Sequence, residues 1–271
     1  MNKALFIAWR IEGPEQGSWS PVGRLDFADG VYRFCYTRGA QTLAGFHPFP
    51  GMPQLDVVYD SDTLFPIFAN RLLSESRPEY EAYLTWAGFD ANAPPGPLAI
   101  LGVTEGRRQT DSLEVFPCPA PDSHGCYLTK FFLHGIRWFP VPAINRISNL
   151  KHGDRLLLMA DFMNRVDRFA VAVRTADDSD RYTLGYVPRY FARDFLTVGL
   201  NCDPDMIDLR VEQVNVDAPL QMRLLCRLNS CWPKNFQPCA GDDFQPIVSA
   251  SAPRSPWWPF SRSGAKSQVA K

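Results

Sequence analysis

A short stretch in the middle of the chain constrains the fold more than any other feature. It reads Pro117-Cys118-Pro119-Ala120-Pro121-Asp122-Ser123-His124-Gly125. Its three prolines lack backbone N–H donors, so neither a helix nor an inner strand can pass through it. The chain has 271 residues, more than the usual domain size of about 100–200. We therefore expect two modules, residues 1–117 and 127–240, joined by a proline-rich linker over 118–126.

The charge balance changes across this linker. Residues 1–126 carry 9 Lys and Arg against 15 Asp and Glu, whereas residues 127–240 carry 15 against 12. An acidic half followed by a slightly basic half favours different partners for the two modules. The basic excess is far below that of a strongly basic DNA-binding domain, so nucleic-acid affinity must come from a local site.

Composition narrows the class of protein. Hydrophobic residues make up 45% and charged residues 21%, which excludes global disorder. No stretch reaches the ~20 apolar residues of a membrane span, and the apolar run Ala4–Arg10 is too short for a signal peptide. We expect a cytoplasmic protein that needs no cofactor and does not enter a membrane.

The cysteine count is seven, an odd number, and reduced thiols are expected. Only the gap between Cys226 and Cys231 fits the close spacing of structural zinc ligands. Burial as small apolar side chains is the competing interpretation. The sequence leaves open whether zinc binds four of the cysteines: Cys202, Cys226, Cys231 and Cys239.

Hydrophobic patterning predicts an α+β protein whose first module is a small sheet with two helices. The expected strands are 4–10, 22–27, 31–36, 55–59 and 113–116, and the expected helices are 63–73 and 77–87. Asp29-Gly30 between two alternating strands is typical of a tight hairpin.

The second module is expected to be a six-stranded β-barrel of the OB or SH3 type with an inserted helix. The expected strands are 127–139, 154–160, 169–174, 182–187, 206–216 and 220–228, with a short helix or turn over 143–150. Pro188 is suited to the first position of a helix that reaches about residue 196. Residues 241–271, rich in proline and serine, are expected to form a disordered tail.

Catalytic motifs are absent from the sequence. It has no phosphate-binding glycine loop, kinase catalytic loop or nucleophile elbow. None of the four histidines, His47, His124, His134 and His152, has a carboxylate or cysteine at motif spacing. We therefore expect a protein that is not an enzyme and holds no metal, and a hydrolase with an unrecognised site stays as an alternative.

Three motifs in the second module resemble the HIRAN domain, a small barrel found beside chromatin-remodelling helicases and in bacterial proteins. The first is Leu133-His134-Gly135-Ile136-Arg137-Trp138-Phe139. The second is Leu150-Lys151-His152-Gly153-Asp154, which leads into a strand. The third combines the run Asn164–Val173 with Gly185-Tyr186-Val187-Pro188. Their order and spacing together carry the resemblance, over residues 132–195.

The resemblance implies capture of a single-stranded DNA 3′ end in a pocket on the barrel. Arg137 would hold a phosphate, and Trp138 and Phe139 would stack on bases. Asn164 and Asp167 would contact the terminal nucleotide and its 3′-hydroxyl, and Tyr186 would form the opposite wall. Val166 departs from the family, because the DNA-binding relatives have an aromatic residue there. The residues by themselves also allow Trp138 and Phe139 to be core, and Asn164 and Asp167 to be turn formers.

Residues 20–117 resemble the N-terminal subdomain of HipA-type serine/threonine kinases. The match lies in Val22-Gly23-Arg24-Leu25, the alternating aromatics that follow Gly30, and the run 64–73. It implies a docking module for a separately encoded HipA-like kinase, with Phe65, Phe68 and Asn70 as contacts; core positions for both phenylalanines are the competing interpretation.

The function expected from both resemblances is a non-catalytic protein that binds nucleic acid and a partner, as an antitoxin or accessory of a HipA-like kinase. The alternative is a DNA-end recognition module for a repair or defence helicase or nuclease acting in trans. The resemblances also imply a bacterial source, and a barrel that serves as a structural or protein-binding adaptor is a further alternative.

Overall fold

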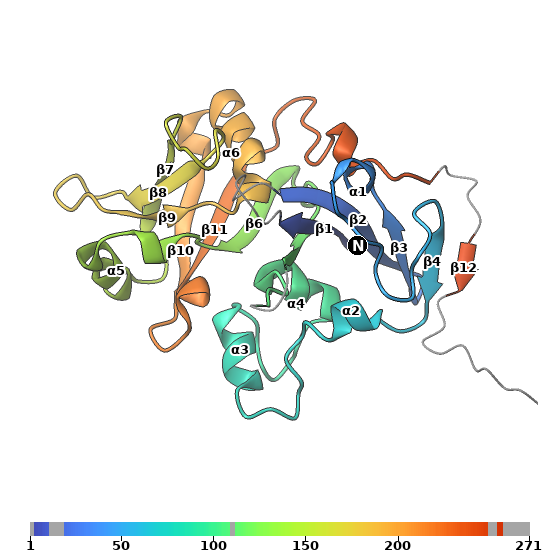
Figure 1. The fold of residues 1–271 in the computed structure, drawn as a ribbon. Coiled ribbons are helices and arrows are strands. Elements are labelled where there is room, and N and C mark those ends of the chain that lie inside the picture. Colours follow the sequence, from blue (N-terminus) through green and yellow to red (C-terminus); the bar gives the residue numbers. More distant parts are fainter. Residues whose placement is uncertain (1–2, 11–18, 109–111, 249–253, 257–271) are drawn as a thin grey trace, which may run out of the picture.

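Two β-sheets and a set of short helices make up the computed structural model, which describes residues 3–10, 19–108, 112–248 and 254–256. Figure 1 shows the two sheets side by side, with α2, α3 and α4 below them. The expected mixed α+β class is confirmed. Among the described helices none is long and apolar enough to cross a membrane.

The first sheet has the strand order β12-β4-β3-β2-β1-β5, antiparallel except for the parallel pair β12 and β4. The turn between β2 and β3 is the expected tight hairpin, because Asp29 and Gly30 both have positive φ, 54° and 77°. Its strands are β1 (Lys3–Arg10), β2 (Trp19–Ala28), β3 (Val31–Tyr36), β4 (Val58–Ser61), β5 (Leu113–Pro117) and β12 (Arg254–Pro256).

Four short helices accompany this sheet: α1 (Arg38–Thr42), α2 (Pro66–Ala69), α3 (Tyr80–Trp86) and α4 (Pro97–Thr104). The helix expected over 63–73 is only the single turn α2. Phe65 and Phe68 are both 0% exposed and pack against Phe34 in the core. The prediction that these two phenylalanines contact a partner is therefore corrected to a core role, whereas Asn70 is exposed.

The second sheet is a curled half-barrel of six antiparallel strands in the order β6-β11-β10-β7-β8-β9. The number of strands is as predicted, while the OB or SH3 assignment stays a prediction. The elements are β6 (Cys126–Phe132), α5 (Val141–Ser148), β7 (Arg155–Ala160), β8 (Val171–Thr175), β9 (Thr183–Tyr186), α6 (Arg189–Asn201), β10 (Asp208–Val214) and β11 (Leu224–Cys231), with 3₁₀ turns η1 (Ile136–Trp138), η2 (Pro204–Met206) and η3 (Leu220–Met222).

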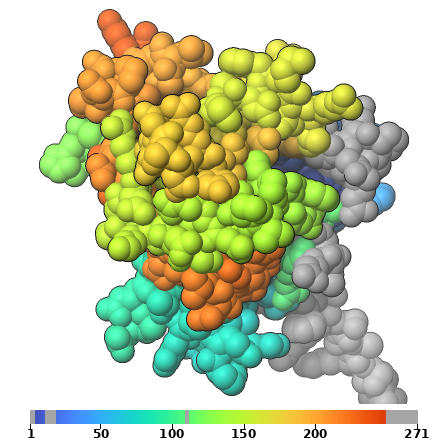
Figure 2. All heavy atoms as spheres, turned by 90° about the vertical axis from the view of Figure 1, so that its left-hand side faces the viewer, coloured from blue at the N-terminus to red at the C-terminus, as the bar shows by residue number. Residues whose placement is uncertain are grey.

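The two sheets share buried side chains. Phe6, Ala8 and Phe116 of the first sheet belong to the same hydrophobic cluster as the core of the half-barrel. Phe116 stacks on Tyr190 of α6 with ring centroids 4.4 Å apart. On another side the η3 turn, orange in Figure 2, rests on the teal segment that contains α3. The two modules are thus packed together through an apolar interface.

The segment after the half-barrel returns to the first sheet. Residues 241–248 contain the turn η4 (Asp242–Phe244), and Phe244 meets Phe6 edge-on at 5.0 Å. Ile247 donates its backbone N–H to the carbonyl of Tyr36 at 3.0 Å. The prediction of disorder from residue 241 is therefore wrong for 241–248, where apolar side chains fix the chain. Most of the remaining tail lies outside the described residues.

Candidate functional site

The loop after β6 carries the first of the predicted site residues. The strand expected over 127–139 ends at Phe132, because Gly135 has a left-handed φ of 71° and leads the chain into η1. Trp138 is 76% exposed, and the Arg137 guanidinium lies 4.7 Å from its ring centroid. The alternative that Trp138 is a core residue is wrong, and its indole is free to stack on a ligand.

The end of β9 lies against this loop. His134 and Tyr186 exchange backbone hydrogen bonds of 2.8 and 2.9 Å as an isolated bridge. Gly185 permits the approach, because a Cβ at this position would lie 2.6 Å from the His134 carbonyl oxygen. The ring of Phe139 packs against Tyr186 with centroids 5.7 Å apart. The Gly-Tyr pair of the third motif is thus a structural requirement of the site.

The loop between β7 and β8 supplies two more predicted residues. The Asn164 side-chain oxygen accepts the backbone N–H groups of Val166 and Asp167, both at 3.0 Å. One Asp167 oxygen accepts from the Phe169 N–H at 2.9 Å, and the other pairs with Arg189 at 3.2 Å. Both residues are therefore turn formers, as one interpretation of the sequence held. The same bonds fix their side chains at the surface of the loop.

A cleft of about 280 Å³ is bordered by the loop after β6, the end of β9 and the loop between β7 and β8. Four of the six predicted binding residues line it: Trp138, Asn164, Asp167 and Tyr186. Arg137 and Phe139 flank it, through their contacts with Trp138 and Tyr186. The opposite wall comes from the first module, and this contribution was not predicted; it consists of Arg10, Trp19, Arg107 and Glu114.

A buried carboxylate connects the two modules at the edge of this cleft. Glu105 is 3% exposed, and its Oε1 lies 2.6 Å from His134 Nε2 and accepts the Tyr190 hydroxyl at 2.5 Å. Arg107 lies 3.6 Å from the same carboxylate and 3.0 Å from Glu114. Motif spacing missed this network because Glu105 and His134 are 29 residues apart.

The electrostatics of Glu105 follow from these contacts. Burial by itself would raise the pKa of Glu105, but the adjacent His134 and Arg107 and the Tyr190 hydroxyl outweigh it, so its pKa lies below the usual range. Burial raises the pKa of Tyr190 well above its ordinary value, and the Glu105 charge adds to this effect. Glu105 is thus held as an anion facing a neutral phenol, and its bonds join α6 and His134 to the first module.

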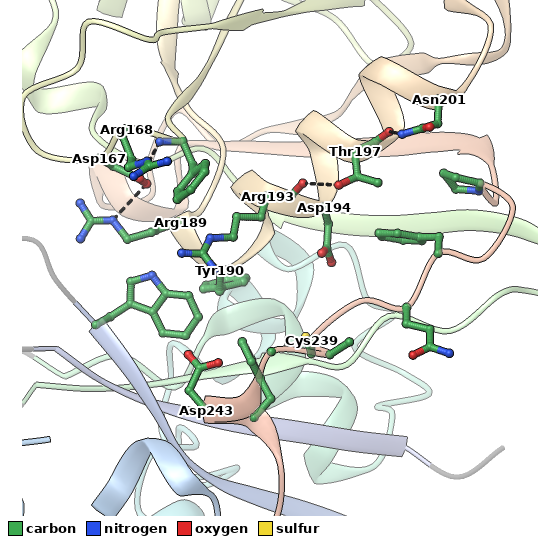
Figure 3. A pocket seen from close by; sticks show the side chains of 18 of the residues that line it. Asp167, Arg168, Arg189, Tyr190, Arg193, Asp194, Thr197, Asn201, Cys239 and Asp243 are labelled. Atoms are coloured by element: carbon green, nitrogen blue, oxygen red, sulfur yellow. Dashed lines mark hydrogen bonds and ion pairs between the residues drawn. The ribbon is translucent and has the colours of Figure 1, made fainter. Parts of the chain in front are cut away.

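A larger cleft of about 710 Å³ lies next to the first one, between α6 and the segment after β11. Figure 3 shows Arg189, Arg193, Thr197 and Asn201 along the helix above it. Below them, Asp194 points toward the segment that contains Cys239. The two clefts share four lining residues: Trp19, Val166, Asp167 and Arg189.

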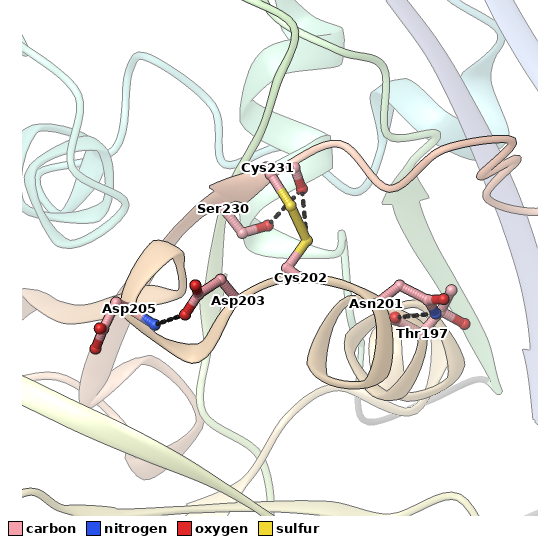
Figure 4. Close-up of a disulfide and its surroundings, with 7 residues drawn as sticks. All are labelled: Thr197, Asn201, Cys202, Asp203, Asp205, Ser230 and Cys231. Carbon is pink, nitrogen blue, oxygen red and sulfur yellow. Dashed lines mark hydrogen bonds between the residues drawn. A yellow bond between two sulfur atoms is a disulfide. The ribbon is translucent and has the colours of Figure 1, made fainter.

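A disulfide links the two walls of the larger cleft. Cys202 follows α6 directly and is bonded to Cys231 at the end of β11, with Cα atoms 6.2 Å apart (Figure 4). The prediction that all cysteines are reduced is therefore corrected for this pair. Among the described residues no group of three or more His, Cys, Asp or Glu is placed to hold a metal ion. The zinc alternative has no site, because Cys202 and Cys231 bond to each other and Cys226 is buried in β11.

Comparison with known proteins identifies one domain. Residues 127–229 match the HIRAN domain, a module that in general recognises nucleic acid at single-stranded DNA 3′ ends. The crystal structure of a protein from Lactobacillus plantarum is 20% identical over 39% of this chain and 97% of that chain, with a TM-score of 0.29. No curated protein matches the chain. The resemblance of residues 20–117 to HipA-type kinases is found by none of these comparisons and stays a prediction.

Proposed function

We propose that this protein is a non-catalytic DNA-end-binding protein whose HIRAN domain and first module together bind the 3′-terminal nucleotide of single-stranded DNA. The observation that carries the proposal is the smaller cleft, where Trp138, Asn164, Asp167 and Tyr186 converge. These residues are the ones that the HIRAN motifs bring to the binding pocket, and the matched range 127–229 contains all of them.

The chemistry of the cleft suits a nucleotide. An exposed indole offers a face on which a base can stack, worth ~1–3 kcal/mol. Arg137 lies against that indole and can reach a phosphate. The Asn164 and Asp167 side chains are held in place by backbone hydrogen bonds, which reduces the ordering cost of contacts with a terminal sugar.

The first module completes the pocket in this proposal. Arg10 and Arg107 both approach Glu114, at 3.9 and 3.0 Å, and Arg107 also pairs with Glu105 at 3.6 Å. The two guanidinium groups offer charged hydrogen-bond donors to a phosphate there. Trp19 adds a second aromatic surface to the cleft, which Val166 also lines. A role as antitoxin of a HipA-like kinase has no comparable observation behind it.

Among the described residues, the dyad of His134 and Glu105 favours a hydrolase. In such a dyad the histidine would be the general base and the buried carboxylate would orient it, but none of the described residues that line the smaller cleft is a Ser, Thr or Cys nucleophile. We infer that the dyad holds the modules together. Incubation of 5′-labelled DNA with the protein and Mg²⁺ should leave the DNA intact, and protein-dependent cleavage that His134→Gln abolishes would replace our proposal with the hydrolase.

The direct test is the fluorescence anisotropy of 5′-labelled single-stranded DNA. We expect tighter binding of an oligonucleotide with a free 3′-hydroxyl than of the same oligonucleotide with a 3′-phosphate, because the added charge would face Asp167. Equal affinity for both ends, or no binding of either, would reject the proposal.

A further inference from the structure

We propose that the larger cleft is the track for the nucleotides that precede the 3′ end, so that a DNA strand held in the smaller cleft continues between α6 and residues 233–244. This inference rests on the proposed function and extends it to a second site. The two clefts share a wall of four residues, Trp19, Val166, Asp167 and Arg189, so a strand can pass from one to the other.

One face of α6 forms the first side of the track. Arg189, Arg193, Thr197 and Asn201 follow one another at intervals of four residues, and all four line the cleft. Figure 3 shows them in a row along the helix. Thr197 and Asn201 already donate to the carbonyls of Arg193 and Thr197, at 2.9 and 2.7 Å, so the guanidinium groups are the main donors that this face offers to a chain of phosphates.

Two arginines in this cleft have no ion-pair partner among the described residues. The guanidinium groups of Arg168 and Arg193 lie 4.7 and 4.4 Å from the ring centroid of Phe169. Neither forms an ion pair with a carboxylate of the described residues, in contrast to Arg189, which pairs with Asp167. Guanidinium groups that lie over an aromatic ring and have no acidic partner among the described residues suit phosphate binding.

The floor of the cleft contains an unused polar atom. Asp194 lines the cleft although its side chain is more than nine-tenths buried, and its Oδ2 has no hydrogen-bond partner among the described residues. A buried polar atom without a partner is costly, and a ligand group can satisfy it. Burial raises the pKa of Asp194 to about 7, so near neutral pH about half of the molecules hold it protonated, which reduces its repulsion of phosphate.

The other side of the track lies outside the matched domain. Residues 233–244 lie beyond the range that matches the HIRAN domain, and they contribute Lys234, Asn235, Phe236 and Gln237 to the lining. The disulfide between Cys202 and Cys231 fixes the start of this segment to the end of α6. The matched domain therefore supplies one side of the track through α6, and its C-terminal extension supplies the other side.

The experiment compares two DNA lengths on the full chain. Oligothymidines of about three and about ten nucleotides, each with a free 3′-hydroxyl and a 5′ label, are titrated by anisotropy, because single-strand sites span ~4–16 nucleotides. We expect roughly tenfold tighter binding of the longer strand. Arg193→Ala should remove about fivefold of that gain in affinity and leave the affinity for the trinucleotide unchanged. For the longer strand it should reduce the slope of log affinity against log salt concentration by about 0.7. Arg181→Ala, an exposed arginine in neither cleft, is the matched control.

The outcomes separate the track from the end pocket. Equal affinity of wild-type protein for both lengths would overturn the track and leave the proposed function standing. An equal loss of affinity for both lengths in Arg193→Ala would also overturn the track, because the residue would then act on the end pocket. No binding of either oligonucleotide by wild-type protein would reject the proposed function itself.

Discussion

His134 Nε2 lies 2.6 Å from Oε1 of Glu105, and the proline-rich linker lies between these two residues in the sequence. The same oxygen accepts the Tyr190 hydroxyl, so one carboxylate of the first module joins two elements of the half-barrel. The candidate binding cleft lies beside this junction, and residues of both modules line it. Stability of the junction and geometry of the cleft are therefore expected to be linked.

Loss of the Glu105 charge should loosen the junction. Glu105→Gln keeps the shape of the side chain but removes the anion that faces His134 and Arg107. We expect the free energy of unfolding to fall by about 1–3 kcal/mol, since the buried hydrogen bonds with His134 and Tyr190 lose their charged partner. Urea denaturation measures it, with the exposed Glu79→Gln as the control, which should change it by less than about 0.5 kcal/mol. An unchanged midpoint for Glu105→Gln would contradict a role in holding the modules together.

Trp138 should be important for binding and unimportant for stability. Its side chain is 76% exposed, so Trp138→Ala should leave the melting temperature nearly unchanged. Affinity for single-stranded DNA should fall by ~1–3 kcal/mol through lost stacking, with little change in salt dependence. Phe131→Ala is the contrasting variant, because Phe131 is buried and its truncation should cost ~3–5 kcal/mol of stability. A Trp138→Ala protein that is stable and binds as tightly as wild type would exclude Trp138 from the site.

Asp194 should make stability depend on pH. Its pKa is about 7 in the folded protein and lies near 3.8 in an unfolded chain. Between these two pKa values the folded state keeps a proton that the unfolded state has lost. The contribution of Asp194 to the free energy of unfolding is therefore fully present below the unfolded pKa and is lost as pH rises through about 7. At about 1.4 kcal/mol per pKa unit, the loss between pH 4 and 7 is roughly 4 kcal/mol.

Asp194→Asn should flatten this pH profile. The free energy of unfolding of wild type and variant, measured at several values between pH 4 and 8, should diverge as pH rises, with the variant relatively more stable at the alkaline end. Asp217→Asn, at an exposed position, should follow the wild-type curve. Parallel curves for wild type and Asp194→Asn would show that Asp194 does not retain its proton.

Reduction of the disulfide should destabilise the half-barrel. Cys202 and Cys231 close a loop with a sequence separation of 29 residues, for which chain entropy gives ~3–4 kcal/mol. We expect the double variant Cys202→Ser, Cys231→Ser to unfold at lower urea, and reductant to lower the wild-type midpoint without affecting the variant. Cys35→Ser, which alters an unpaired cysteine, is the control. Titration of seven free thiols in the denatured, unreduced protein would contradict the bond.

Local chemistry in the sequence determined the elements and much of the site. The Asp29-Gly30 hairpin and the helix that begins after Pro188 depend on backbone preferences that act within a few residues, so the sequence predicts them. The HIRAN motifs likewise brought Trp138, Asn164, Asp167 and Tyr186 to one cleft. Each of these residues is fixed by its own turn or bridge, which is why a linear pattern is enough to find it.

Only the tertiary structure decided how distant segments meet. Glu105 reaches His134, and Cys202 reaches Cys231, through the packing of whole elements, and no short motif encodes such contacts. Trp138 is exposed because β6 ends at Phe132, so Trp138 does not lie in a strand of the sheet. Phe65 is buried because it packs into the aromatic cluster around Phe34. Side-chain direction and burial are set by the sum of long-range contacts, so residue type alone could not separate an exposed stacking surface from a core position.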